Sequence, residues 1–208
     1  MTFNIATFNQ QVGGTLVPNN LYAVQITFPI DPNQTNNFRL MWPVFAPTAP
    51  DFDTVLESLT WRCVAAPLPG QAIRTSESNR HGLGVREKMP FATAYTDVSL
   101  TFFADNKGDV THQFWKAWLE YVSTSIGNVN GRTAYTIEYK DNFTATIQIN
   151  TYNVDGSLLQ THYLYEVFPI AINDANMSWN EMNSLLLYNV TVTFVNWAFT
   201  NNADGSGD

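Results

Sequence analysis

Few residues in this chain could do chemistry, and their spacing forms no reactive or metal-binding group. None of the three histidines, His81, His112 and His162, is part of a His-X-X-X-His pair or of a recognisable cluster of ligands, which a zinc site would need. The single cysteine, Cys63, lies in an apolar run, where a thiol is expected to be a small core residue and not a nucleophile. With one cysteine, an intramolecular disulfide is excluded.

Recognisable catalytic motifs are missing from the sequence as well. There is no Gly-X-Ser-X-Gly turn and no glycine-rich phosphate loop with a lysine, and Gly82-Leu83-Gly84 lacks the third glycine of a dinucleotide-binding loop. No pair of carboxylates stands out as the acid and base of a glycosidase. We therefore predict that the chain is not an enzyme and that it needs neither a cofactor nor a metal.

The chain carries unusually little charge for its size. Only 13% of its 208 residues are charged, against about 25% in an average soluble domain, whereas 14% are aromatic. Such a composition indicates that much of the surface is buried against other copies of the chain; the alternative is an unusually neutral monomer. The net charge of −8 argues against a conventional nucleic-acid-binding face, which is basic. It leaves open a surface past which nucleic acid slides without sticking.

Two of the predicted strands have a polar face without charge. Because side chains alternate across a strand, the residues of each face can be read from the sequence. A neutral face suits the wall of a channel for nucleic acid, since a cation would hold each passing phosphate. An ordinary half-exposed sheet would show the same alternation, and periodicity does not decide between the two. The residues predicted to face a lumen are Thr144, Thr146, Gln148 and Asn150 on one strand and Asn189, Thr191 and Thr193 on the other.

A segment with an excess of positive charge, Gln71–Lys88, is predicted to be a long loop between two strands. Four basic and two acidic residues give it a local charge of +2, which leaves −10 for the rest of the chain. A positive projection on an acidic body favours contact between identical copies, in which the loop of one meets the body of the next. A solvated loop is the alternative. The basic residues are Arg74, Arg80, Arg86 and Lys88.

The remaining pattern along the chain is mainly that of β-strands. Five prolines between Pro29 and Glu57 indicate an ordered insertion with little sheet, since proline removes ladder donors. Asp155-Gly156 is a hairpin-turn signal between two strands. We predict strands at Leu21–Phe28, Leu59–Ala65, Tyr95–Phe103, Thr133–Tyr139, Phe143–Tyr152, Tyr163–Phe168 and Leu185–Trp197.

One helix is predicted, at Thr111–Val122, with Asp109 or Thr111 as its N-cap. Its large apolar residues lie on or beside one helical stripe, which forms a face for docking on a sheet. A platform for an aromatic cofactor or a sugar is the alternative use of such a face. The docking residues are Phe114, Trp115 and Trp118.

A single domain accounts for residues 21–198, with the proline-rich insertion at 29–57. Residues 1–20 are expected to form an N-terminal arm, and residues 199–208 a flexible tail. The first residues lack the cationic start and apolar core of a signal peptide. No apolar run approaches about 18 residues, so no membrane-spanning segment is expected.

A set of short blocks carries a family resemblance over residues 20–198. They are Tyr22–Phe28, Cys63–Gly70, Gly82–Phe91, Thr96–Asp105, Phe114–Trp118, Phe168-Pro169-Ile170, Trp179 and the final strand ending at Trp197. In this order, the blocks resemble the tail-tube proteins of contractile-tailed bacteriophages, a family whose fold is shared with the tube protein of type VI secretion.

The resemblance implies a mainly β fold, namely a small antiparallel β-barrel or sandwich with one short helix and a long inter-strand loop. It further implies that six copies pair their sheets edge to edge into a ring with a continuous inner barrel. Stacked rings would form a tube through which DNA leaves the capsid. Ring closure would also remove unpaired strand edges, which are a hazard in a monomer. On this basis the neutral strand faces line the lumen, and the segment Gln71–Lys88 contacts the next ring.

The same resemblance implies a structural protein of the virion tail, assembled in the host cytoplasm and without a membrane role. Its partners would be other copies of itself, the tail sheath, the baseplate and the tail-terminator protein, with DNA in transient, non-specific passage. The insertion at 29–57 departs from compact members of the family, so a baseplate-proximal tube initiator is the alternative within it. A carbohydrate-binding β-sandwich is the alternative from another class, because the chain is rich in Trp and Tyr.

Overall fold

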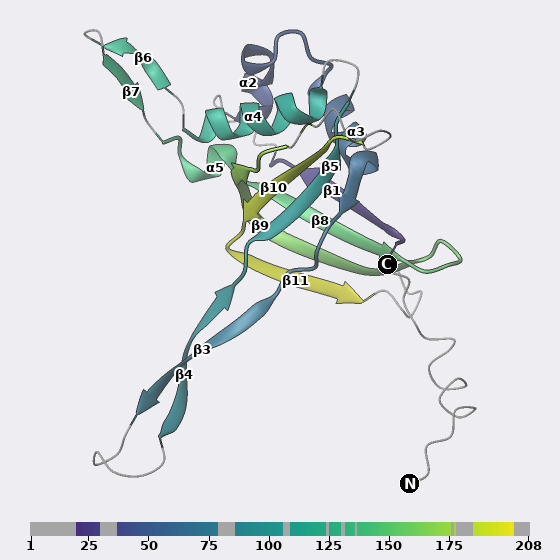
Figure 1. Cartoon of the computed structure of the whole chain (residues 1–208), viewed down its shortest axis with the longest axis vertical. Coiled ribbons are helices and arrows are strands. Elements are labelled where there is room, and N and C mark those ends of the chain that lie inside the picture. The colour runs from purple at the N-terminus through teal and green to yellow at the C-terminus, as the bar shows by residue number, and fades with distance from the viewer. Residues whose placement is uncertain are drawn as a thin grey trace.

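An antiparallel sheet with helices over one face forms the body of the protein, and a long hairpin projects from it (Figure 1). The structure is a computed structural model. It describes residues 20–29, 37–78, 86–105, 109–123, 125–129, 132–135, 137–175, 177 and 185–201. The predicted fold class, mainly antiparallel β, is confirmed.

The described strands divide into one large sheet and two separate hairpins. The large sheet has the order β1-β8-β9-β10-β5-β2, and β11 also pairs with β9. One separate hairpin is β3–β4 and the other is β6–β7. The strands are β1 (Tyr22–Thr27), β2 (Cys63–Ala65), β3 (Gln71–Ser78), β4 (Glu87–Tyr95), β5 (Val98–Phe103), β6 (Ser125–Val129), β7 (Arg132–Tyr135), β8 (Ala145–Tyr152), β9 (Leu158–Ile172), β10 (Leu187–Thr193) and β11 (Asn196–Asn201).

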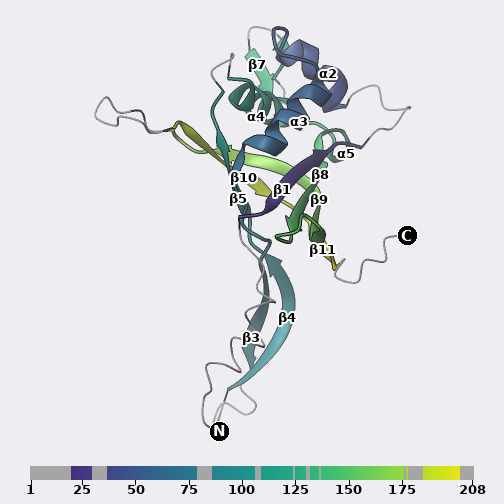
Figure 2. The same ribbon diagram turned by 90° about the vertical axis from the view of Figure 1, so that its right-hand side faces the viewer.

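Strand β9 is long enough to belong to both halves of the large sheet. Its first half lies between β8 and β11, and its second half pairs with β10. The hydroxyl of Tyr22 on β1 donates to the carbonyl of Cys63 on β2, 3.3 Å away, so the two ends of the strand order lie close together and the sheet is curled. Figure 2 shows the large sheet from the side, with α2, α3 and α4 above it and the hairpin β3–β4 below. The predicted turn between β8 and β9 is confirmed, with Gly156 at a φ of 84° that suits glycine.

Glu166 marks the corner between the two halves of β9, at a φ of 52°. This left-handed conformation costs an L-residue about 1–2 kcal/mol. We expect Glu166→Gly to raise the free energy of unfolding by about 1 kcal/mol, although it removes the surface ion pair with Lys140. The matched control is Glu166→Ala, which loses the same ion pair and keeps the strain. Urea unfolding compares the two, and equal stability would show that the corner holds no strain.

The four described helices gather over one face of the sheet. They are α2 (Phe38–Phe45), α3 (Phe52–Arg62), α4 (Val110–Val122) and α5 (Lys140–Phe143). Helix α4 occupies the segment predicted to be helical, and its Phe114, Trp115 and Trp118 are completely buried. The indole N–H of Trp118 donates to the carbonyl of Phe143, 2.8 Å away. Asp109 stands at the N-cap position, but its side chain makes no capping bond.

The proline-rich insertion, predicted to be ordered with little sheet, contains α2 and the first part of α3, and no strand among its described residues. Asn37 caps α2 by accepting from the N–H of Arg39, and Asp51 caps α3 by accepting from the N–H of Asp53. These caps and the buried apolar residues of both helices outweigh the proline content. The rings of Phe38, Trp42 and Phe52 pack around Phe114 of α4, within about 6 Å between centroids.

Several other predicted boundaries were wrong, among them that of the strand predicted at Leu185–Trp197, which is divided into β10 and β11. The strand predicted at Leu59–Ala65 is the last turn of α3 followed by the three-residue β2. The loop predicted at Gln71–Lys88 is a β-hairpin, whose strands are β3 and β4. The strand predicted at Tyr95–Phe103 is divided, since Tyr95 ends β4 and Val98 begins β5. Because β11 extends to Asn201, residues 199–201 belong to the sheet and not to a flexible tail.

Candidate functional site

One face of the large sheet is polar and almost without charge. Strands β1, β5, β8, β10 and β11 contain no Asp, Glu, Lys or Arg, and β9 contains only Glu166, which forms an ion pair with Lys140. On β8, Ile147 and Ile149 are buried under the helices, whereas Gln148 between them points to the opposite face. The sheet therefore separates an apolar face, covered by helices, from a neutral polar face.

The polar face continues across four neighbouring strands in register. Gln148 of β8 lies between Gln25 of β1 and Tyr163 of β9, and Tyr163 in turn lies beside Ala198 of β11. A second row begins with Thr27 and Thr146. Sequence analysis missed the contribution of β1, β9 and β11 to this face. The alternation within Tyr22–Phe28 was a usable signal, but it did not say on which side of a sheet that strand lies.

Two residues predicted to line a lumen are buried within the chain. Thr144 and Asn150 are 8% and 7% exposed, and Asn150 accepts a hydrogen bond from the hydroxyl of Thr161, 2.9 Å away. By the alternation of the strand, Asn150 lies on the same face as Gln148, and Thr144 precedes Thr146 in the same phase, so their assignment to a lumen stays a prediction. Thr146 and Gln148 remain half-exposed on the polar face.

The other predicted polar face belongs to β10, beyond the corner of β9. Asn189 is exposed, and Thr191 and Thr193 are half-exposed. The hydroxyl of Thr101 on β5 donates to the side-chain oxygen of Asn189, 2.7 Å away. The structure thus brings the two predicted faces onto one sheet, but on its two different halves.

Both edges of the four-stranded half of the sheet lack a described partner strand. Strand β1 pairs with β8 alone, and β11 pairs with β9 alone, among the strands that the structure describes. These two strands bound the four-stranded half of the sheet, β1-β8-β9-β11. Unpaired edges expose rows of backbone N–H and C=O groups that can pair with another chain.

A groove runs along the free edge of β1. It lies between that strand and α3 and has no lining residue from β8. Trp61, at the end of α3, also lines a second hollow beside the start of β1 and is 79% exposed. We call the first hollow the edge groove; it is lined by Gln25, Ile26, Thr27, Leu56, Glu57, Thr60 and Trp61.

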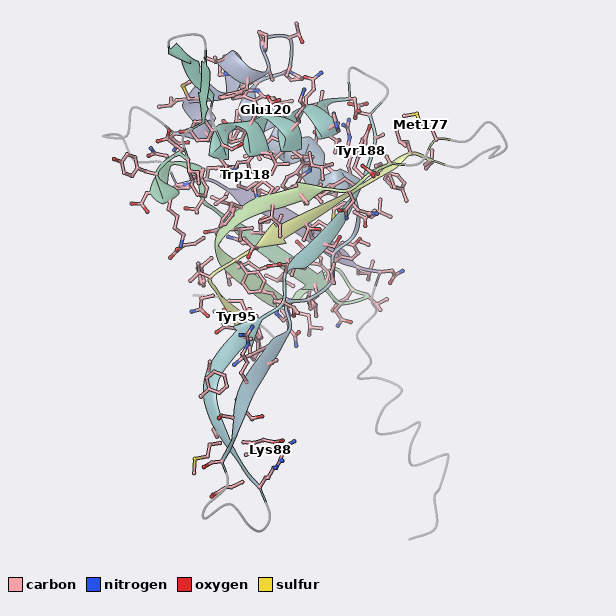
Figure 3. All side chains as sticks on the ribbon, turned by 60° about the vertical axis from the view of Figure 1, so that its left-hand side comes forward. Lys88, Tyr95, Trp118, Glu120, Met177 and Tyr188 are labelled. Atoms are coloured by element: carbon pink, nitrogen blue, oxygen red, sulfur yellow. The ribbon has the colours of Figure 1, made fainter. Side chains whose placement is uncertain are left out.

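The projecting hairpin β3–β4 carries the predicted basic residues. Arg74 lies on β3, Arg86 just before β4, and Lys88 on β4 towards the far end (Figure 3). Arg86 forms a 2.9 Å ion pair with Glu77 across the hairpin. Arg80 lies outside the described residues. The hairpin is exposed along nearly all of its length, so its basic side chains point into solvent.

The base of the hairpin is held against the sheet. The ring of Tyr95 packs on Phe194 at 5.7 Å between centroids, and its hydroxyl donates to the side-chain oxygen of Asn196, 3.3 Å away. A two-stranded hairpin is only marginally stable alone in water. Its exposed apolar residues, Ile73, Met89 and Phe91, indicate a surface that packs on another molecule.

The residues with reactive side chains do not form a site. No group of three His, Cys, Asp or Glu residues able to hold a metal ion is found in the described parts of the chain. Burial raises the pKa of the Cys63 thiol to about 12, so it is neutral at physiological pH. Burial lowers the pKa of His162, which packs on Trp197 and Phe199. His112 packs on Tyr188, and His81 lies outside the described residues.

None of the described helices is long and apolar enough to span a membrane. The polar face, the two free edges of the half-sheet and the hairpin β3–β4 are the candidate surfaces for association with other molecules.

Comparison with solved structures identifies proteins of the same fold. The chain is similar to a chain of the anti-feeding prophage baseplate, at 12% identity and a TM-score of 0.55, over 90% of this chain and 97% of that one. It is also similar to a chain in the sheath–tube complex of an extracellular contractile injection system, at 15% identity and a TM-score of 0.53, over 96% and 99%. At these identities the likeness shows the fold alone. A search of curated proteins gave no match.

The family is shown by sequence. A profile of the phage tail tube proteins matches residues 17–200, which is nearly the whole of the chain. This protein therefore belongs to the phage tail tube protein family and is a structural component of a tail tube.

Proposed function

We propose that this protein is the repeating subunit of the tube, and that six copies close into a ring by joining β11 of one copy to β1 of the next. The observation that carries the proposal is the four-stranded half-sheet β1-β8-β9-β11, which combines two free edges with one uncharged face. Joining these edges pairs both free edges of the half-sheet and turns six half-sheets into one inner barrel.

The strand directions are compatible with such a ring. Each pairing from β1 through β8 and β9 to β11 is antiparallel, so β11 runs opposite to β1. A rotational symmetry axis makes β1 run in the same direction along the axis in every copy. The joint between β11 and the next β1 is therefore antiparallel too, and the alternation continues around the ring without a break.

The neutral face then becomes the wall of the channel. Residues of four strands, among them Gln25, Thr146, Gln148 and Ala198, face the lumen, and DNA passes them without a fixed cation to hold its phosphates. The polar residues of β10 lie on the other half of the sheet. Asn189, Thr191 and Thr193 remain candidates for the lumen near one rim of the ring.

The hairpin β3–β4 supplies contacts between rings. Arg74, Arg80, Arg86 and Lys88 meet the acidic body of a subunit in the next ring, since the chain as a whole has a net charge of −8. The sheath, the baseplate and the tail-terminator protein are the other partners, and the tube is assembled in the host cytoplasm as part of the virion tail.

Cysteine cross-linking tests the ring. Gln25 and Ala198 are exposed on the polar face at opposite edges of the half-sheet. Within one copy they lie three strand spacings apart, about 14 Å. In a Cys63→Ser background, Gln25→Cys combined with Ala198→Cys and treated with a bis-maleimide shorter than about 10 Å is expected to give a ladder of covalent species ending at the hexamer.

Each single cysteine variant is the control, because one cysteine per copy can give at most a covalent dimer. Electron microscopy of the uncross-linked protein at high concentration should show rings and stacked rings. A protein that stays monomeric and yields no ladder at any concentration would overturn the proposal.

A further inference from the structure

Rows of side chains across the half-sheet end in an uncovered aromatic residue. Val24, Ile149, His162 and Phe199 are cross-strand neighbours in that order on the face under the helices. The first three are 2%, 1% and 8% exposed, whereas Phe199 on β11 is 58% exposed. One side of the Phe199 ring stacks on His162 at 6.0 Å between ring centroids, and the other side of the Phe199 ring is exposed.

The neighbouring row has the same form. Ile26, Ile147 and Leu164 are at most 7% exposed, and the row ends at Trp197 on β11, which is only partly buried. The helices cover the first three strands of the half-sheet and leave the fourth uncovered on its apolar side. Within the part of the chain that the structure describes, the exposed side of Phe199 has no cover, which suits a contact with another molecule.

The opposite edge of the half-sheet offers such a cover. Helix α3 packs on β1 through Val55 and Leu59, which are buried, and it overhangs the edge groove with Leu56 and Trp61. Trp61 is 79% exposed, more than any other tryptophan among the described residues. The edge groove is thus bounded on one side by the free edge of β1 and on the other by side chains of α3, of which Trp61 is aromatic.

The backbone of β1 presents its free groups to this groove. The N–H of Tyr152 donates to the carbonyl of Leu21, 2.9 Å away, which sets the phase of the ladder between β8 and β1. In an antiparallel ladder the bonding alternates, so Leu21, Ala23 and Gln25 bond to β8. The N–H and C=O groups of Tyr22, Val24 and Ile26 point the other way, towards the position that a fifth strand would occupy.

We infer that β11 of one copy lies in the edge groove of the next copy, where its Phe199 packs against Trp61 of α3. This inference rests on the proposed ring and names the side chains that hold it together. A strand added beside β1 continues the sheet, so the apolar side of β11 faces the same way as Val24 and Ile26, towards α3. The two uncovered aromatic residues then cover each other, and both rows of the sheet become fully buried.

A second copy fits the groove better than an unrelated peptide. The chain itself carries a six-residue strand with a free edge, β11. On its apolar side β11 exposes Phe199, which can pack against the exposed Trp61 of α3. Strand β11 also has no charged residue that would have to be buried there. Aromatic residues at the centre of an interface, desolvated on both sides, are the ones that usually carry most of its binding energy.

Truncation of the two aromatic side chains, Trp61 and Phe199, tests the contact between them. Trp61→Ala and Phe199→Ala are each expected to weaken ring formation at least about tenfold, measured as the protein concentration at which rings dissociate on dilution. Both side chains are largely exposed in the single chain, so the circular dichroism spectrum and monomer stability should not change. The double variant should be no weaker than the weaker single variant, because both changes remove one shared contact.

Leu40→Ala and Val44→Ala serve as matched controls. Both residues are exposed, at 57% and 68%, and lie on α2 without lining the edge groove. Protein rings assembled from either control variant should dissociate at the same protein concentration as wild-type rings. If wild-type rings form and the Trp61 and Phe199 variants are equally stable, or if the two losses are simply additive, this contact is wrong while the ring stands. If the wild-type protein forms no rings, the proposed function itself fails.

Discussion

Trp118→Ala is expected to lower the free energy of unfolding by about 3–5 kcal/mol, the usual cost of removing a buried tryptophan. Trp118 is completely buried, stacks on Trp115 at 5.5 Å and on Phe38 at 5.9 Å, and approaches Phe28 to 4.7 Å between centroids. These rings come from α4, from α2 and from Phe28, the residue after β1, so the cavity would open where the helices meet the sheet. The lost indole N–H would also leave the carbonyl of Phe143 without its bond.

The loss is large compared with a total stability of about 5–15 kcal/mol for a domain. Urea unfolding followed by circular dichroism, at a concentration where the chain is monomeric, would measure it. Trp61→Ala is the matched control, since it deletes the same side chain from an exposed position and should change monomer stability by no more than about 0.5 kcal/mol. Equal effects of the two changes would mean that α4 does not dock on the sheet through Trp118.

Gln148→Lys is expected to make assembled tubes hold DNA that wild-type tubes release. Gln148 is in the middle of the neutral face, between Gln25 and Tyr163, and a lysine there would place one cation per subunit on the proposed wall of the channel. Several lysines would contact phosphates at once, so the affinity should fall by about a thousandfold between 50 and 200 mM salt. Binding of labelled single strands and duplexes to purified tubes, at both salt concentrations, measures this.

The control for charge alone is Thr54→Lys, which adds the same cation on the exposed side of α3. Tubes of this variant should bind DNA no more than wild-type tubes do. If Gln148→Lys tubes behave like the Thr54→Lys tubes, the neutral face does not line the channel.

Local patterns predicted the elements that have one buried face. The alternation of Ile147 and Ile149 with polar residues predicted β8, and the stripe of Phe114 and Trp118 predicted α4, because burial on one side imposes a period of two on a strand and 3.6 on a helix. The same reasoning failed for Leu59–Ala65. Its apolar residues suited a strand, but Val55 and Leu59 form one face of a helix with residues further upstream.

The hairpin β3–β4 was missed for the opposite reason. Its strands bury no face in the single chain, so no apolar period distinguishes Gln71–Ser78 from a loop. The sequence showed only the excess of positive charge in this segment. That charge indicated a contact surface but did not indicate that the segment is a β-hairpin. The insertion has little sheet, as predicted, but its two helices were not predicted, because the caps Asn37 and Asp51 count for more than the prolines around them.

By itself, the sequence determined the mainly β class, the docking helix, the neutral strand faces and the family, since each of these depends on residue types at short spacings. The tertiary structure alone decided which strands are edges, which polar residues stay buried, as Asn150 does, and that Phe199 and Trp61 are left uncovered at opposite ends of one half-sheet. Those properties depend on the pairing of residues far apart in the chain, and no local period records which strand lies beside which.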